Sequence, residues 1–434
     1  MQTSFTPAQL RDPALAAANQ ELRRCVHCGL CTATCPTFVL LGDELDGPRG
    51  RIYLIKDMLE SGRPATEEVA RHLDRCLSCL SCTTTCPSGV QYARLIDQAR
   101  VHVEATYRRP LPDRLLRAAL AAVLPHPARL RAALRAARAA RPFGHLLGRA
   151  LPQGRLAARL AAMLALAPGR PLPRPTRGRG VHRPEGPRRG RVALLEGCAQ
   201  SVLAPSIQEA TIRLLTRLGI EVVVADAGCC GALTHHMGRP APAHRAARRA
   251  IAAWRREIEG EGLDAIIVTT SGCGTVMKEY GAMFRGDPVG EAPAREVAER
   301  VLDITEYLGR IGYAATRPPS GLNIAYHAAC SLQHGQRVTE PPKALLRQAG
   351  FAVREPAEAH LCCGSAGTYN LLQPEIAGRL RARKLANLAA TNPDAIAAGN
   401  IGCLVQLGGA GVPVLHTVEL LDWMAGGPRP AALG

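Results

Sequence analysis

The chain has 434 residues, of which 47% are hydrophobic, 21% charged and only 3% aromatic, a composition that suits two or more domains with buried cores. The net charge of +18 is not spread over the chain: residues 108–191 hold 20 arginines against two acids, while the rest holds 34 basic and 34 acidic residues. A protein that is basic over its whole surface, as in a nucleic-acid groove, is therefore excluded, and one basic insert remains.

The cysteine content and the hydropathy indicate where the protein works. Sixteen regularly arranged cysteines do not suit a secreted disulfide scaffold, which is normally a short domain. No secretory signal is visible in the first 24 residues, so we expect the thiols to lie in a reducing cytosol. The longest apolar window, 156–167, is interrupted by Arg159 and is too short to span a bilayer, so any membrane contact should be peripheral.

The first segment, residues 1–107, contains one cysteine motif twice. CVHCGLCTATCP and CLSCLSCTTTCP both have the C-x₂-C-x₂-C-x₃-C-P spacing of two-cluster bacterial ferredoxins. Three thiolates in a tight loop hold three corners of one [4Fe–4S] cluster, and the fourth reaches the other cluster. The predicted ligand sets are therefore crossed: Cys25, Cys28, Cys31 and Cys86 for cluster 1, and Cys76, Cys79, Cys82 and Cys35 for cluster 2.

A pair of zinc sites is the alternative for these motifs. Zinc sites use C-x₂-C pairs separated by a longer loop, which a C-x₂-C-x₂-C triplet fits poorly. His27, inside the first loop, is expected to tune the cluster by hydrogen bonding rather than to bind it.

The basic insert consists of two segments, 108–167 and 168–190. The first is rich in Ala, Leu and Arg and predicts helices, in one of which Arg131, Arg135 and Arg138 share a face that suits either anionic lipid or plain solvent. The second has 18 Pro, Gly or Arg among its 23 residues and predicts a linker that packs no core. Prolines should cut the helical segment into short pieces, at Pro110, Pro112, Pro125, Pro127, Pro142 and Pro152.

From residue 191 onward, short β-branched strands alternate with helical stretches, as in α/β domains, and the pattern occurs twice. Each copy has a first cysteine, a C-C-G triplet and a last cysteine nine positions after an aspartate, Asp264 or Asp394. We expect two tandem α/β units, 191–318 and 319–434, with cysteines at strand ends. These are Cys198, Cys229, Cys230 and Cys273 in the first CCG unit, and Cys330, Cys362, Cys363 and Cys403 in the second.

The eight cysteines of the CCG units are candidate ligands of additional clusters or metal ions. A C-C-G triplet places two sulfurs on one sharp turn, and the distant cysteines complete a site from other strand ends. Buried apolar cysteines are an alternative reading, as is a strained disulfide between adjacent residues. Four nearby histidines are ligands, proton donors or structural residues, namely His235, His236, His327 and His334.

The order of these motifs resembles a known family. Two C-x₂-C-x₂-C-x₃-C-P motifs followed by two CCG units are similar to the iron–sulfur subunits that include heterodisulfide reductase, anaerobic glycerol-3-phosphate dehydrogenase, lactate-utilisation proteins and glycolate oxidase. The resemblance is strongest to glycolate oxidase iron–sulfur subunits and covers nearly the whole chain. It is carried by CVHCGLCTATCPTFVLLGDELDGPRGRIYLIK, HLDRCLSCLSCTTTCPSGV, LEGCAQ, AGCCGA, TTSGCG, LQHGQ, HLCCGSAGTYNL and AGNIGC.

The resemblance implies an α-helical two-[4Fe–4S] ferredoxin-like domain followed by two tandem α/β CCG domains. It also implies an electron-transfer subunit at the cytoplasmic face of the inner membrane, whose flavin-containing partner subunits oxidise glycolate to glyoxylate. Electrons then pass through the clusters of this chain to an acceptor, a quinone. The chain has no G-x-G-x-x-G that opens a helix after a strand, so no flavin is expected on it, and no catalytic residue is assigned.

One departure from the family pattern concerns the CCG units. In the full motif the last cysteine belongs to a C-x-x-C pair, and in heterodisulfide reductase five thiolates hold a non-cubane cluster. Here Thr270 and Asn400 replace the first cysteine of that pair. With four thiolates per unit a cluster is chemically feasible, and the sequence leaves open whether either CCG unit holds metal.

Two alternatives remain open from the sequence. Within the same chemistry, the partner oxidises lactate or glycerol 3-phosphate, or the complex is of the heterodisulfide-reductase type. In a different class, the chain is a metal-stabilised nucleic-acid-binding protein that uses the arginine-rich insert. Few aromatic residues and only four lysines argue against a nucleic-acid partner.

Overall fold

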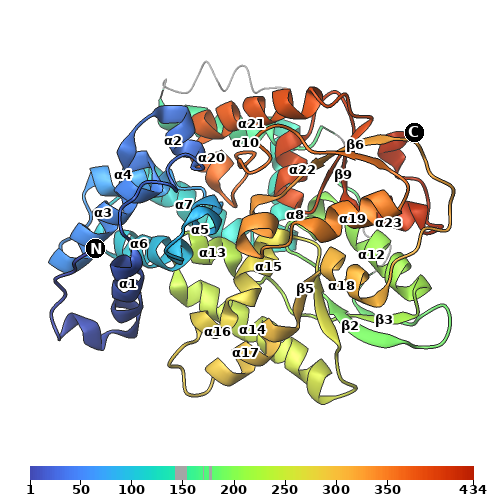
Figure 1. The fold of residues 1–434 in the computed structure, drawn as a ribbon, viewed down its shortest axis with the longest axis horizontal. Coiled ribbons are helices and arrows are strands. Elements are labelled where there is room, and N and C mark those ends of the chain that lie inside the picture. Colours follow the sequence, from blue (N-terminus) through green and yellow to red (C-terminus); the bar gives the residue numbers. More distant parts are fainter. Residues whose placement is uncertain (142–153, 170, 175–177) are drawn as a thin grey trace.

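The computed structural model describes residues 1–141, 154–169, 171–174 and 178–434, which form a helical N-terminal domain, connecting helices and two α/β units (Figure 1). Prolines begin the first three α-helices, as their fixed φ angle and missing N–H allow. The elements of this domain are η1 Gln9–Arg11, α1 Pro13–Arg24, α2 Pro36–Leu41, η2 Glu44–Asp46, α3 Pro48–Ser61, α4 Glu67–Asp74, α5 Ser81–Thr85 and α6 Tyr92–Thr106. Their apolar faces meet in one core, which includes Leu22, Ile55, Leu59, Leu73, Leu95 and Ile96.

The connecting helices are α7 Leu111–Val123, α8 Pro127–Ala140 and α10 Arg155–Ala165, as the prolines of this segment predict. Pro142 and Pro152 lie outside the described residues. Ion pairs hold α7 on the N-terminal domain, because Asp74 of α4 accepts from the buried Arg117 at 2.8 Å and from Arg109, just before α7, at 2.6 Å. Some of the positive charge of the insert is therefore neutralised inside the molecule.

The three arginines of the predicted basic face of α8 differ in their contacts. Arg131 donates hydrogen bonds to the carbonyl oxygens of Pro173 at 2.9 Å and Ser201 at 3.4 Å. Arg135 and Arg138 are exposed. Two of the three arginines thus face solvent, and the third ties α8 to the first CCG unit.

The predicted linker differs from the structure at one point. Within it, β1 Gly180–His182 pairs antiparallel with β3 Ile220–Val224 and extends the sheet of the first CCG unit. Val181 is 56% exposed, so this edge strand contributes backbone hydrogen bonds rather than core side chains. A strand of this kind has no apolar pattern that a sequence reading can detect.

The first CCG unit has a five-stranded sheet in the order β1-β3-β2-β4-β5, parallel except for β1. Its remaining strands are β2 Gly190–Leu194, β4 Ala265–Val268 and β5 Val301–Asp303. Its helices are α11 Gln200–Leu203, α12 Ser206–Arg217, α13 Ala232–His236, α14 Pro240–Glu259, α15 Ser271–Lys278, α16 Tyr280–Met283, α17 Glu291–Arg300 and α18 Ile304–Ile311.

The second CCG unit has a parallel sheet in the order β7-β6-β8-β9, which matches β3-β2-β4-β5 of the first. Its strands are β6 Asn323–His327, β7 Ala352–Arg354, β8 Ala395–Ala398 and β9 Val414–His416. Its helical elements are the π-helical turn η4 Ser331–Gly335, α19 Glu340–Gln348, α20 Tyr369–Leu372, α21 Pro374–Ala389, α22 Ile401–Leu407 and α23 Thr417–Met424, followed by η5 Ala431–Leu433.

The repeat predicted from the sequence is visible in atomic detail. The aspartate of each copy accepts a hydrogen bond from the backbone N–H at the start of the first strand: Asp264 from Arg191 and Asp394 from Asn323, both at 2.7 Å. This contact fixes the same register in both units, so that residue 195 corresponds to residue 327.

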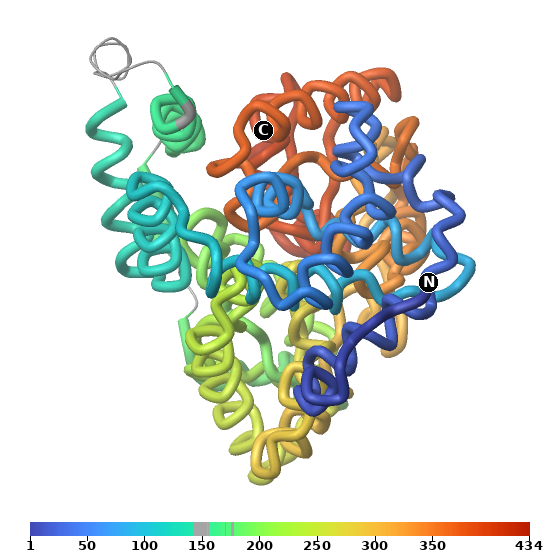
Figure 2. Tube along the Cα trace, turned by 90° about the vertical axis from the view of Figure 1, so that its left-hand side faces the viewer, coloured from blue at the N-terminus to red at the C-terminus, as the bar shows by residue number. Residues whose placement is uncertain are grey.

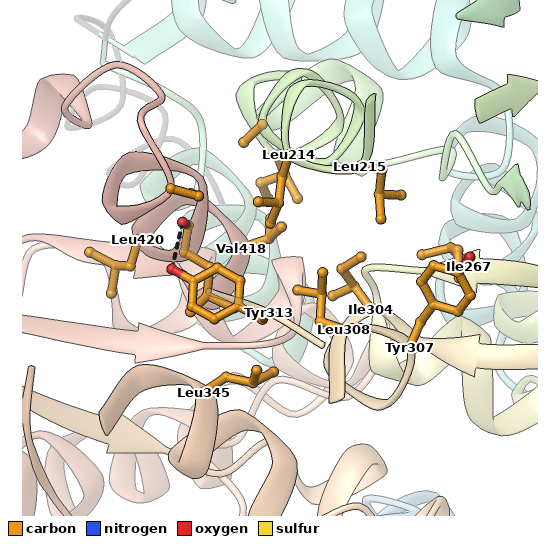
Figure 3. Packing of buried hydrophobic residues seen from close by; sticks show 14 of the residues in the cluster. Leu214, Leu215, Ile267, Ile304, Tyr307, Leu308, Tyr313, Leu345, Val418 and Leu420 are labelled. Carbon is orange, nitrogen blue, oxygen red and sulfur yellow. Dashed lines mark hydrogen bonds between the residues drawn. The ribbon is translucent and has the colours of Figure 1, made fainter. Parts of the chain in front are cut away.

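The two CCG units share one apolar core. Leu214 and Leu215 of α12 and Leu308 of α18 pack with Leu345 of α19 and Val418 of α23 (Figure 3). Parallel strands with apolar residues on both faces require such helical cover. The fold class inferred from the motifs is confirmed.

The N-terminal domain packs on both CCG units, and Figures 1 and 2 show it beside the C-terminal chain as well as the middle of the chain. Gly238, after α13, lies so close to α6 that an added Cβ would come within 2.4 Å of the Arg100 carbonyl oxygen. Tyr369 of α20 donates a hydrogen bond to the Arg75 carbonyl oxygen at 3.0 Å. Among the described residues, no helix is long and apolar enough to cross a membrane.

Candidate functional site

The two cysteine loops of the N-terminal domain have the same backbone shape. In the first loop His27 and Gly29 have positive φ angles, and Ser78 and Leu80 have them at the matching positions of the second loop. Three of these four residues are not glycine, and the left-handed region is costly for them. Such backbone strain at matching positions fits loops shaped to turn several thiols toward one centre.

The first loop lines a cavity together with the last cysteine of the second loop. Its wall contains Val26, His27, Gly29, Arg49 and Tyr92 besides the thiols. Five thiols line it, those of Cys25, Cys28, Cys31, Cys82 and Cys86.

The second loop lines a neighbouring cavity together with the last cysteine of the first loop. Arg51 and Tyr92 contribute to its wall, and Cys82 borders both cavities. Its thiols are Cys35, Cys76, Cys79 and Cys82. The four cysteines of each predicted ligand set therefore line one cavity together, and Cys82 lines both.

The two cavities differ in depth. In the first group Cys28 is exposed, and the neighbouring Val26 and Leu30 are 67% and 58% exposed. In the second group all four cysteines are buried. The first cavity thus lies at the surface of the protein and the second in its interior.

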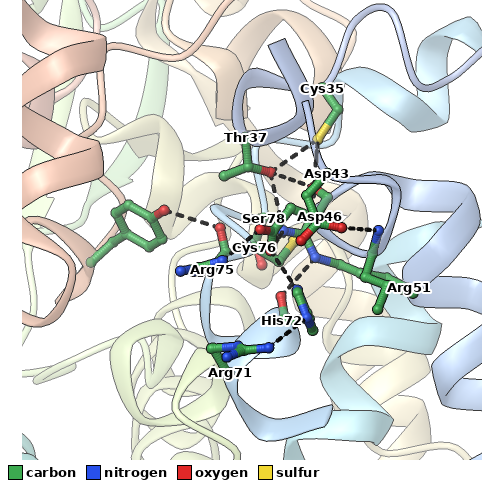
Figure 4. Close-up of polar contacts among 12 residues, drawn as sticks. Cys35, Thr37, Asp43, Asp46, Arg51, Arg71, His72, Arg75, Cys76 and Ser78 are labelled. Carbon is green, nitrogen blue, oxygen red and sulfur yellow. Dashed lines mark hydrogen bonds and ion pairs between the residues drawn. The ribbon is translucent and has the colours of Figure 1, made fainter. Parts of the chain in front are cut away.

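A buried charge network borders the second cavity (Figure 4). Asp46 pairs with Arg75 at 2.7 Å, with His72 at 2.9 Å and with Arg51 at 3.5 Å. Arg51 also lies 3.8 Å from the Cys35 sulfur. Although burial opposes its charge, the neighbouring thiols and Asp46 raise the pKa of Arg51, so a permanent cation stands beside this cavity.

Each C-C-G triplet forms a sharp turn that only glycine can close. Gly231 and Gly364 have φ angles of +85° and +90°, and an added Cβ would meet the carbonyl oxygens of Ala243 and Ala377 at 2.7 and 2.6 Å. In both turns the glycine N–H donates to the first sulfur of the pair at 3.4 Å. The triplet therefore packs its turn against the following helix and orients its two sulfurs.

The thiols of the first CCG unit are brought together as the sequence predicts. The sulfurs of Cys198 and Cys229 are 3.7 Å apart, and Cys230 and Cys273 pack in one apolar cluster with Ala193. Hydrogen bonds from Cys198 and from the backbone N–H of Gly231 lower the pKa of the Cys229 thiol. Thr270, in place of the missing cysteine, donates to Gln200 at 2.7 Å.

The thiols of the second CCG unit form a matching row. The sulfurs of Cys330 and Cys362 are 3.7 Å apart, and those of Cys363 and Cys403 are 3.6 Å apart. Asn400, in place of the missing cysteine, points its amide at the Cys403 sulfur from 3.6 Å. The residue that replaces the lost thiol thus contacts one of the remaining thiols of this unit.

A histidine adjoins the thiols of the second CCG unit. His327, at the end of β6, is 1% exposed, and neither ring nitrogen has a hydrogen-bond partner among the described residues. One of its ring nitrogens and the sulfurs of Cys363 and Cys403 all lie within 4.8 Å of one another. Burial, helped by the charge of Lys384, lowers the pKa of His327 to about 3.

The second cavity of the N-terminal domain adjoins the second CCG unit. Leu77, Cys79, Cys362, Tyr369 and Ile376 belong to one buried cluster, and Cys330 packs against it. The apolar clusters around Cys230 and Cys273 in the first CCG unit and around Cys363 and Cys403 in the second each draw their described members from their own unit, so the contact with the N-terminal domain is made by Cys330 and Cys362. The second unit is therefore the one whose thiols pack beside the buried cavity.

The other histidines have partners outside the thiol groups. His235 and His236 pair with Asp97 of α6 at 3.1 and 3.3 Å, and His334 shares a hydrogen bond with Thr84 at 2.8 Å. These contacts join the CCG units to the N-terminal domain. The sequence did not reveal the Asp46 and Arg51 network, because nothing in its local pattern distinguishes it from a surface ion pair.

Two family models match the chain. The 4Fe-4S dicluster domain matches residues 21–90, and the cysteine-rich CCG domain matches residues 192–278 and 324–408. The first match covers both cysteine loops, and the other two cover the repeated α/β units.

Full-length relatives decide the family. The glycolate oxidase iron–sulfur subunit of Escherichia coli (strain K12) is 43% identical over 97% of this chain and 98% of its own length. The chain belongs to the glycolate oxidase iron–sulfur subunit family. The probable glycolate oxidase iron–sulfur subunit of Bacillus subtilis (strain 168) is 31% identical over 89% of this chain and 88% of its own length. Lactate utilization protein A of Bacillus velezensis is 26% identical and covers 54% of this chain.

Membership of the family accounts for the two cysteine-rich parts of the chain. The chain is an iron–sulfur protein of the electron-transfer type, and these two relatives are subunits of glycolate oxidases. The resemblance read from the motifs is confirmed over the whole length.

Proposed function

We propose that this chain is the electron-transfer subunit of a flavin-dependent complex that oxidises glycolate to glyoxylate. Two [4Fe–4S] clusters on the crossed ligand sets carry one electron at a time, and a flavin on partner subunits divides the electron pair. No flavin and no substrate chemistry are assigned to this chain. The proposed acceptor is a quinone, which takes up two electrons and two protons.

The single observation that carries the proposal is the grouping of the eight thiols around two adjacent cavities that share Cys82. A shared wall places two redox centres next to each other, as a path for electrons requires. The ligand sets are Cys25, Cys28, Cys31 and Cys86 for cluster 1, and Cys76, Cys79, Cys82 and Cys35 for cluster 2. Zinc would not need loops of this triplet form.

The unequal depth of the cavities gives the path a direction. Cluster 1 lies at the surface, where Val26 and Leu30 offer exposed apolar contacts to the flavin-containing subunit. Cluster 2 lies in the interior beside the thiols of the second CCG unit. Electrons enter at cluster 1, move to cluster 2 and leave past the second CCG unit toward the acceptor.

The remaining parts of the chain have supporting roles in this proposal. The domains are the two-cluster domain (1–107), the arginine-rich connector (108–190) and the CCG units at 191–318 and 319–434. The exposed Arg135 and Arg138 of α8 face anionic lipid at the cytoplasmic side of the inner membrane, where the acceptor quinone is reached. Deletion of the insert should abolish salt-sensitive binding to anionic vesicles.

The experiment is an anaerobic iron and acid-labile sulfide count with electron paramagnetic resonance, on the chain alone and with its flavin partner. About eight irons per chain indicate two cubane clusters. Glycolate should reduce these clusters only when the flavin subunit is present. Protein that is colourless and binds zinc alone would contradict the proposal, and reduction by lactate but not by glycolate would reassign the partner's substrate.

A further inference from the structure

A histidine that is not part of the CCG motif, His327, lies beside the thiols of the second CCG unit. His327 lies three residues before Cys330, and its ring points toward the pair Cys363 and Cys403 within 4.8 Å. At the matching position of the first unit the chain has Leu195, which packs in the apolar cluster of that unit. The two units are therefore unlike at this position.

The burial of His327 calls for a partner. Buried polar atoms in proteins are nearly always hydrogen-bonded, because a lone one costs roughly 1–3 kcal/mol. Both ring nitrogens of His327 lack a partner among the described residues, although the side chain is 1% exposed. A bound metal ion would satisfy one of them.

The geometry of the sulfurs fits a single ion. Two thiolates on one tetrahedral zinc ion lie about 3.8 Å apart, since each Zn–S bond is about 2.3 Å long. The sulfurs of Cys363 and Cys403 are 3.6 Å apart. An imidazole nitrogen and two thiolates that converge in this way are the donors that Zn²⁺ and similar ions prefer.

We propose that His327, Cys363 and Cys403 bind one divalent transition-metal ion of the zinc type in the second CCG unit, and that the first unit has no such site. The Asn400 amide, 3.6 Å from the Cys403 sulfur, donates to that thiolate and orients it. Lys384 of α21, 2% exposed and anchored on the Glu358 carbonyl oxygen at 2.7 Å, adds a positive charge near the thiolates. The site is independent of the proposed direction of electron flow.

The test uses the full chain with its iron–sulfur clusters, loaded with Zn²⁺ and dialysed. We expect one tightly held zinc ion per chain in the wild type, and zinc X-ray absorption should show one nitrogen ligand with sulfur ligands. His327→Leu, which introduces the residue of the first unit, should weaken zinc binding at least about tenfold while the iron content stays unchanged. Cys403→Ser should have the same effect.

A matched control is His360→Leu, because His360 lies in the loop that leads to the triplet and its backbone carbonyl oxygen, which the substitution keeps, lies 3.1 Å from the His334 ring. This variant should keep the zinc ion. Three results would each overturn the proposal: a wild type that takes up no zinc, a zinc site without a nitrogen ligand, or unchanged zinc affinity in His327→Leu. If His327→Leu does not fold, the absorption spectrum of the wild type still decides.

Discussion

Leu195 and Ala250 in the first CCG unit correspond to His327 and Lys384 in the second, since the glycine turns pack on the equivalent Ala243 and Ala377, and all four side chains are buried. The sheets, the glycine turns and the strand-start aspartates of the two units match, so the difference lies in the side chains that surround the thiols. In the first unit these are apolar and fill the core. In the second they are a neutral imidazole and a cation, and this is the unit whose cysteines pack beside Cys79. The same fold thus surrounds the thiols with apolar side chains in the first unit and with polar side chains, beside the proposed cluster 2, in the second.

The largest expected effect tests whether the buried second cavity of the N-terminal domain stabilises the second CCG unit more than the first. Cys79→Ser should remove cluster 2 and reduce the iron content from about eight to about four per chain. Leu77, Cys79 and Cys362 pack together in one buried apolar group. Amide exchange should therefore accelerate in β8 of the second unit and stay unchanged in β4 of the first. Iron analysis and hydrogen-exchange mass spectrometry measure both effects.

Cys198→Ser is the control for that variant, since Cys198 lies in the first CCG unit and pairs with Cys229. It should leave the iron of the two-cluster domain in place. Unchanged iron in Cys79→Ser would contradict the ligand assignment, and equal loosening of both sheets would contradict the unequal coupling of the two units.

The next effect tests the difference between packing and polar chemistry. Trp254 is fully buried, so Trp254→Ala should leave a cavity and lower the free energy of opening of the first unit by about 3–5 kcal/mol. Lys384→Met preserves most of the volume and removes one hydrogen bond to a carbonyl oxygen, so it should cost less than about 1.5 kcal/mol. Native-state hydrogen exchange of β4 and β8 gives both values, and similar costs would refute the distinction.

The smallest effect concerns the contact of Asp97 with His235 and His236. Although burial opposes both charges, the histidines lower the pKa of Asp97, and Asp97 raises the pKa of His235. The stabilisation from Asp97 is present above its unfolded-state pKa of about 4 and is lost only as the pH falls through the lowered pKa. That from His235 is complete below about pH 6.5 and is lost as the pH rises through the raised pKa.

The contact between the N-terminal domain and the first CCG unit should therefore be strongest between about pH 4 and pH 6.5 and weaken as the pH rises through the raised pKa of His235. Arg100 and Glu279 also face this contact. Asp97→Asn should flatten the pH dependence of the thermal midpoint, with a change below about 1 kcal/mol. His102→Gln, a histidine outside the contact, should retain it. An unaltered pH profile in Asp97→Asn would refute the assignment.

The sequence predicted the parts of the molecule that follow from spacing. The two motifs in the N-terminal domain have the spacing that crosses the ligand sets, and the repeated aspartate, triplet and cysteine predict two similar sheets. The edge strand β1 was not predicted, because its backbone pairing leaves no apolar pattern. The role of His327 stayed ambiguous, because a sequence shows that a histidine is near a cysteine in the chain but not which way its ring points within the sheet.

The Asp46 network also lay beyond the sequence. Asp46, Arg51, His72 and Arg75 come from different elements, and only packing shows that they meet beside the Cys35 sulfur. Charged residues of this kind are usually solvated, so sequence reasoning has no basis to select them. The positions of these four residues in the chain do not show that their side chains are buried together.

The exposure of Cys28 has a practical consequence for the oxygen sensitivity of the protein. With the proposed ligand sets, dissolved oxygen reaches the outer cluster first, while four buried cysteines shield the inner one. Oxidative damage should thus begin at the point where electrons enter. A sample handled in air would then keep much of its colour after it has stopped accepting electrons from its partner, so colour alone would overstate the fraction of active protein.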